Sequence, residues 1–152
     1  MTEPDPRRSV LAGLVIGVGM MAAVDEILFH QILAWHHFYD RSTPEVALLS
    51  DGLLHSAELV MLIAGGYVLV DLARRRRLHR ASAVGGFLLG AGAFQLFDGL
   101  INHKVLRVHQ VRYDVEHLLP YDAAWVSAGI VMLAVGILLT ARAGRTAGSR
   151  RP

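Results

Sequence analysis

The chain has 152 residues, of which 53% are hydrophobic and none is cysteine, and its formal charge at neutral pH is +2. The absence of cysteine excludes disulfides, thiolate metal ligands and cysteine nucleophiles, and the length leaves room for one domain, residues 1–152. The basic residues flank apolar runs rather than forming a polar surface with aromatic side chains, so nucleic acid is not an expected partner.

Four apolar runs are each close to the ~20 residues that a bilayer-spanning helix needs. They predict an all-α integral membrane protein, a four-helix bundle surrounded by the lipid bilayer. The expected helices cover about residues 10–33, 46–72, 81–101 and 123–141. Short polar segments connect them, so no separate soluble domain is expected.

Lysine and arginine are divided unequally between the two sides of these helices. Eleven of the fifteen flank one set of helix ends, and four flank the other. The eleven are Arg7, Arg8, Arg74, Arg75, Arg76, Arg77, Arg80, Arg142, Arg145, Arg150 and Arg151. Because cytoplasmic loops carry the excess of positive charge, both termini are expected in the cytoplasm.

The first apolar run ends in "VDEILFHQILAWHH", residues 24–37, where Asp25, His30 and His36 are spaced as D-x4-H-x5-H. An ionised side chain in the bilayer costs at least ~2.5–3.5 kcal/mol, so such residues indicate a functional site by default. Glu26 and His30 share a helix face at i and i+4, whereas Asp25 lies ~140° around an α-helix from His30. One narrow stripe therefore cannot hold all three.

The second run contains "DGLLHSAE", in which Asp51, His55 and Glu58 at i, i+4 and i+7 share one face. An imidazole between two carboxylates is the stereochemistry of a metal ligand set. In the alternative interpretation, Asp51 serves the helix dipole, while His55 and Glu58 hydrogen-bond a neighbouring helix.

The third run ends in "FDGLINHKVLRVHQ", residues 97–110, where Asp98, His103 and His109 repeat the D-x4-H-x5-H spacing. A shift of 73 positions also superimposes three glycines of each segment: Gly13, Gly17 and Gly19 on Gly86, Gly90 and Gly92. Glycines at i and i+4 let membrane helices approach closely, so the first and third helices are expected to form the central contact.

With a two-residue adjustment the second and fourth helices also align, Asp51 with Asp122 and Ser56 with Ser127. The chain is therefore expected to be two tandem parallel helical hairpins, residues 10–73 and 81–142, related by a pseudo-two-fold axis along the membrane normal. Asp122 follows Pro120 at a helix start, where a carboxylate usually serves the helix dipole.

These polar residues predict a transition-metal site on the extracytoplasmic side. The leading ligands are His30, His55, Glu58 and His103, with Asp25 and Asp98 as ligands or as partners that orient the imidazoles, and Asp51, His36 and His109 as further candidates. Asp25 and Asp98 could instead link helices by hydrogen bonds. The nitrogen and oxygen donors suit Zn, Fe, Mn or Cu(II). Haem, with His30 and His103 as axial ligands, is the less favoured cofactor.

The segments "VDEILFHQILAWHHFYD", "SDGLLHSAE" and "FDGLINHKVLRVHQVRY" resemble a bacterial family of small predicted membrane proteins, domain of unknown function 2243. The resemblance runs from about Val10 to Thr140. It implies a four-helix protein of the bacterial inner membrane and supplies no activity, cofactor or catalytic residue, so function must be argued from the site.

Three functions fit the pattern. The first is a metal-binding membrane protein with a redox or metal-handling role. The second is a scaffold without metal, whose outer loops bind another membrane protein or a second copy of the chain. The third is a proton- or ion-coupled transporter with Asp25, Glu58 and Asp98 as a relay, although the cytoplasmic half has few polar residues to continue a path. The sequence identifies no catalytic residue.

Overall fold

The computed structural model describes residues 3–148, which are helical apart from their connections and contain no strand. The elements are α1 (Pro6–Val24), η1 (Asp25–Ile32), α2 (Pro44–Arg74), α3 (Arg80–Leu96), η2 (Phe97–Leu106) and α4 (Leu119–Gly148). Because η1 continues α1 and η2 continues α3, the described chain forms four long rods. All four are long and apolar enough to cross a membrane, which confirms the all-α membrane fold.

Several helix bounds differ from the sequence-based expectation by four or more residues. The first rod begins at Pro6 rather than near residue 10, and the third continues beyond residue 101 to Leu106. The fourth runs from Leu119 to Gly148 rather than from about 123 to 141. Pro120 is tolerated in the first turn of α4 because its missing N–H has no intrahelical partner there. Two arginines of the expected basic side, Arg150 and Arg151, lie outside the described residues.

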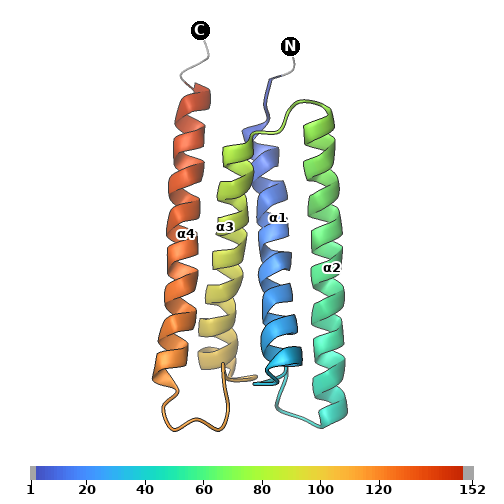
Figure 1. The fold of residues 1–152 in the computed structure, drawn as a ribbon, viewed down its shortest axis with the longest axis vertical. Helices are drawn as coiled ribbons and strands as arrows, with labels where there is room; N and C mark the ends of the chain where they lie inside the picture. Colours follow the sequence, from blue (N-terminus) through green and yellow to red (C-terminus); the bar gives the residue numbers. More distant parts are fainter. Residues whose placement is uncertain (1–2, 149–152) are drawn as a thin grey trace.

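The helices lie in a row in the order α4, α3, α1, α2 (Figure 1). Contacts run from α2 to α1, from α1 to α3 and from α3 to α4, and the described part of the chain has none between α2 and α3. The four helices are therefore arranged as an open row with α1 and α3 at its centre, and α1 also makes a small contact with α4. The start of α1 and the end of α4 lie at one end of the row, and η1 and η2 lie at the other.

Glycine makes the central contact between α1 and α3 possible. A Cβ atom on Gly13 or Gly17 would overlap the backbone carbonyl of Ala83 or Phe87 on α3. The reverse holds as well, because Gly86 and Gly90 of α3 would collide with the backbone of α1 at Val10 and Leu14. The two backbones therefore touch directly, as small residues permit in membrane helices, and this confirms the expected central pair.

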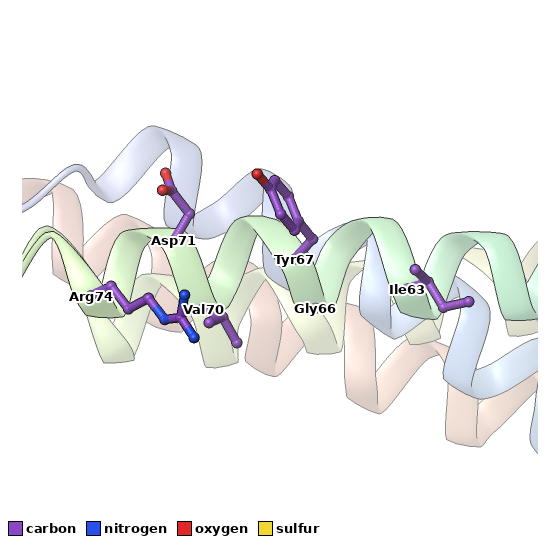
Figure 2. Close-up of a pocket in the computed structure, with 6 residues that line it drawn as sticks. All are labelled: Ile63, Gly66, Tyr67, Val70, Asp71 and Arg74. Carbon is purple, nitrogen blue, oxygen red and sulfur yellow. The ribbon is translucent and has the colours of Figure 1, made fainter.

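The outer faces of α2 and α4 are apolar and exposed, as expected of surfaces that face lipid. Examples are Leu53, Val60 and Ile63 on α2 and Val131 and Leu138 on α4. A groove of about 370 Å³ on α2 is lined by Ile63, Gly66, Tyr67, Val70, Asp71 and Arg74, and Figure 2 shows these residues along one side of the helix. The groove holds no histidine and lies toward the opposite end of α2 from Asp51. It is a depression in the lipid-facing surface rather than part of the polar site.

The two central rods end in π-helices, η1 after α1 and η2 after α3. No pattern in the sequence predicted them. In a π-helix the hydrogen bonds join residues i and i+5, so these residues lie nearly above one another. In an α-helix the same pair is ~140° apart. Each D-x4-H pair has this spacing, Asp25 with His30 in η1 and Asp98 with His103 in η2. The π-helical winding thus resolves the difficulty that one α-helical stripe cannot hold Asp25, Glu26 and His30.

We predict that Gly17→Ala lowers the free energy of unfolding in detergent by about 1–3 kcal/mol, because the added methyl group must displace the backbone of α3. The matched control is Gly66→Ala, since a Cβ at Gly66 meets nothing within 4 Å. Denaturant titration followed by circular dichroism measures both. Equal stability of the two variants would contradict the assigned packing.

Candidate metal centre

Each π-helix is followed within two residues by a residue with positive φ, after which the chain turns back toward the helix ends. Ala34 has a φ of 48° after η1, and Arg107 has a φ of 53° after η2. The next residue closes each turn, since the Trp35 N–H donates to the Phe29 carbonyl at 2.8 Å and the Val108 N–H to the Asn102 carbonyl at 3.0 Å. This reversal carries His36 and His109 back over the buried ends of η1 and η2.

Four imidazoles meet at this place and form what we call the four-histidine cluster: His30, His36, His103 and His109. All four are buried. Their rings form a continuous chain, with centroids 4.6 Å apart for His30 and His36, 4.7 Å for His36 and His109, and 4.7 Å for His103 and His109. The rings of His36 and His109 are stacked, with planes only 3° apart.

One buried carboxylate from each π-helix faces two of these rings. The Asp25 oxygens lie 3.7 Å from Nε2 of His30 and 3.8 Å from Nε2 of His36. The Asp98 oxygens lie 3.0 Å from Nε2 of His103 and 3.3 Å from Nε2 of His109. Two carboxyl groups and four imidazole nitrogens therefore share one buried volume.

The opposite nitrogens of three rings are held by acceptors, which determines where their protons lie. Nδ1 of His36 is 2.9 Å from the Val111 carbonyl, and Nδ1 of His109 is 2.8 Å from the Phe38 carbonyl. A carbonyl can only accept, so each neutral ring carries its proton on Nδ1. Nδ1 of His30 likewise lies 2.7 Å from the Glu26 carboxylate. Nε2 of each ring is consequently left with a lone pair, the form in which histidine binds metals.

The inward-facing atoms have no hydrogen-bond partner in the described structure. They include both carboxylate oxygens of Asp25, one of Asp98, and Nε2 of all four clustered histidines. A lone pair that faces a buried carboxylate is electrostatically unfavourable, and an unsatisfied buried polar group costs several kcal/mol. A positive ion among these atoms would remove the conflict, because it would serve as the common partner of nitrogen and oxygen.

A second group of polar residues borders the cluster on the α2 side. Nδ1 of His30 lies 3.2 Å from Asp51 as well as 2.7 Å from Glu26. Asp51 accepts the Phe38 N–H at 2.7 Å and pairs with Nδ1 of His37 at 2.6 Å. The carboxylates of Glu26 and Asp51 therefore orient His30 in the manner of the outer partners of metal-binding histidines.

The structure brings together six of the nine residues that the sequence singled out as ligands: Asp25, Asp98 and the four-histidine cluster. Asp51 borders this group, whereas His55 does not join it. The His55 side chain is 49% exposed and pairs with the buried Glu58 at 2.5 Å. Asp51 of the same helix reaches His30, but His55 belongs to none of the groups of candidate metal ligands in the described residues. The leading role expected for His55 is therefore not supported by its position.

Two contributors were absent from the expected ligand set. Glu26 holds His30, and its i, i+4 spacing to that histidine was visible in the sequence. Trp125 forms a wall on the α4 side, with its ring centroid 6.0 Å from that of His103. Its indole N–H donates to the Gln95 carbonyl at 3.1 Å, and the Gln95 amide donates to the Trp125 carbonyl at 3.2 Å. No spacing pattern in the sequence indicated this pair.

The loop residue His36 is held in its neutral form. Burial lowers its pKa from 6.5 to about 2, and repulsion from His109 and His30 acts in the same direction. Between these two pH values the unfolded chain binds a proton at this position and the folded protein does not. The free energy of unfolding therefore falls as the pH falls through this window.

We predict that His36→Gln weakens the pH dependence of unfolding between about pH 6.5 and 4, because glutamine has no proton to gain in the unfolded chain. Unfolding in detergent with a chelator present measures the effect without metal. His117→Gln is the control, since the His117 side chain is 79% exposed. A pH dependence unchanged in His36→Gln would show that His36 is not held neutral.

Comparison with known proteins agrees with the resemblance noted in the sequence. The family model described as a predicted membrane protein, DUF2243, matches residues 12–143. No curated protein and no solved structure matches the chain. The matched region includes both D-x4-H-x5-H segments and the four apolar helices. The chain therefore belongs to the DUF2243 family of predicted membrane proteins.

Proposed function

We propose that this multi-pass membrane protein binds a transition metal with the four-histidine cluster, Asp25 and Asp98. The observation that carries the proposal is the orientation of the imidazoles. Carbonyl and carboxylate acceptors hold the Nδ1 protons of His30, His36 and His109, and the Nε2 atoms of all four rings converge on unpaired carboxylate oxygens. Neutral imidazole with an outer hydrogen bond from the opposite nitrogen is the usual state of a histidine ligand.

The donors favour a bare ion over haem. Each Nε2 lies 3.0–3.8 Å from a carboxylate oxygen, a spacing that a single cation can bridge. Ligand atoms of His36, His103 and His109 lie within 4.8 Å of one another, and so do those of Asp25, His30 and His36. Imidazole and carboxylate donors without thiolate suit Zn, Fe, Mn or Cu(II). Such a centre would serve redox chemistry or the handling of a metal ion.

The two ligand segments also support the proposal that the chain consists of two equivalent hairpins. The left-handed residues Ala34 and Arg107 are 73 positions apart. The hydrogen bonds from His36 to Val111 and from His109 to Phe38 cross between the segments in reciprocal fashion, and Phe38 and Val111 are again 73 positions apart. A pseudo-two-fold axis between α1 and α3 would place the metal at the junction of the hairpins.

The alternatives have weaker support. In a scaffold, buried polar groups would satisfy one another, whereas here eight side-chain atoms of Asp25, Asp98 and the four-histidine cluster lack a hydrogen-bond partner. A transporter needs a polar path through the membrane. In the described half of the molecule that holds the termini, the buried polar residues are Ser9 and Ser82, and neither can carry a charge across the remaining distance.

We predict that wild-type protein purified without chelators contains a transition metal, and that His36→Ala and His109→Ala lower the metal content at least ~10-fold, as loss of even an outer partner usually does. His55→Ala and His117→Ala should keep the wild-type content, because both side chains lie outside the cluster. Elemental analysis by mass spectrometry measures all five proteins. Metal-free wild type would overturn the proposal and favour the scaffold.

We also propose that the metal centre faces away from the cytoplasm. The support is the excess of arginine at the end of the row opposite the cluster, where α2 ends with Arg74 and α3 begins with Arg80. We predict that alkaline phosphatase, which is active only outside the cytoplasm, is inactive when fused to the C-terminus and active when inserted after Asp114. The opposite pattern of activity would reverse the orientation.

A further inference from the structure

We propose that metal ions reach the centre from the α2 side, and that His37 and Asp51 form a capture site for a divalent cation at the entrance. This inference rests on the proposed metal-binding function. The two sides of the centre then differ in function: cations enter on the α2 side and not on the α4 side.

A continuous series of polar contacts leads from the surface to the centre on this side. The His37 side chain is 43% exposed, and its Nδ1 lies 2.6 Å from the buried Asp51. Asp51 lies 3.2 Å from Nδ1 of His30, and Nε2 of the same ring faces Asp25 at 3.7 Å. Asp25 then reaches Nε2 of His36 at 3.8 Å. Each step offers nitrogen or oxygen donors to a cation that has lost part of its water.

The chemistry of the first pair suits capture. When Nδ1 of His37 donates to Asp51, Nε2 of His37 keeps its lone pair and can bind a cation, as in carboxylate–histidine pairs beside metals. Partial exposure lets a hydrated ion approach, whereas the buried carboxylate holds the imidazole in place. His30 is the next ring inward, and its Nε2 has no hydrogen-bond partner.

Charge distinguishes the two sides of the centre. The ion-pair partners of Glu26 and Asp51 are histidines, which are neutral or titratable. On the α4 side the residue aligned with Asp51 is Asp122, and Lys104 lies 2.6 Å from its carboxylate. Lys104 therefore neutralises the Asp122 carboxylate on that side. The carboxylates on the α2 side pair with histidines instead and attract an approaching cation.

The α4 side offers aromatic and apolar side chains rather than metal donors, and a groove of about 350 Å³ beside Trp125 is lined mainly by apolar residues. The residue aligned with Glu26 is Gly99, and a Cβ there would collide with the Trp125 ring. The indole therefore occupies the space that a carboxylate fills in the first hairpin. Trp125 is buried and doubly hydrogen-bonded to Gln95, which holds it in place. A hydrated ion consequently meets an aromatic wall on one side and a row of donors on the other.

The test is the rate at which full-length apoprotein, stripped with a chelator and held in detergent, takes up Co²⁺. The absorption bands of bound cobalt report loading in a stopped-flow instrument, and elemental analysis gives the final stoichiometry. His37→Ala removes the exposed donor. Asp51→Asn keeps an oxygen that can accept the Phe38 N–H but removes the charge. His117→Ala is the matched control, an exposed histidine on the same side of the membrane.

We expect His37→Ala and Asp51→Asn to load at least ~10-fold more slowly than wild type, the scale of electrostatic steering. His37→Ala and the control should reach the wild-type stoichiometry, and the control should load at the wild-type rate. Unchanged loading rates in both variants would overturn the route and leave the metal centre standing. Wild type that binds no cobalt would instead overturn the centre, and the route with it.

Discussion

The direct backbone contact between α1 and α3 is the constraint on which the rest of the structure depends. Four glycines remove the side chains that would otherwise separate the two helices. Because the helices are parallel and begin at the same end, their far ends lie side by side (Figure 1). The two D-x4-H segments occupy those ends. Larger residues at the glycine positions would move the two halves of the polar cluster apart.

The winding of η1 and η2 then determines how each half is built. A π-helix is a less common and less stable geometry than the α-helix, and it recurs at functional sites. Here it brings an aspartate and a histidine five residues apart onto one face. The residue with positive φ that follows each π-helix returns a second histidine to the same volume. Each segment therefore supplies an aspartate and a histidine from its π-helix and a second histidine from the loop that follows, all to one buried volume.

The membrane increases the energetic cost of leaving these polar groups unpaired. Unpaired carboxylates and imidazole lone pairs are costly in any protein interior, and no water from the lipid phase can relieve them. The outer helices α2 and α4 expose apolar side chains, so polar groups are confined to the central pair and its immediate border. Differences between the hairpins at that border, such as Glu26 against Gly99, separate a hydrophilic side from an aromatic one.

The sequence by itself determined the membrane class, the number of helices, the central pairing of α1 with α3, and Asp25, His30, Asp98 and His103 as buried polar residues. These follow from hydropathy, glycine spacing and the repeated D-x4-H-x5-H pattern, all of which are local. The tertiary structure alone separated His55 from the cluster and drew His36 and His109 into it. Those outcomes depend on π-helical winding, on two left-handed turns and on an open row of helices, which arise from contacts between distant segments and leave no periodic trace in the sequence.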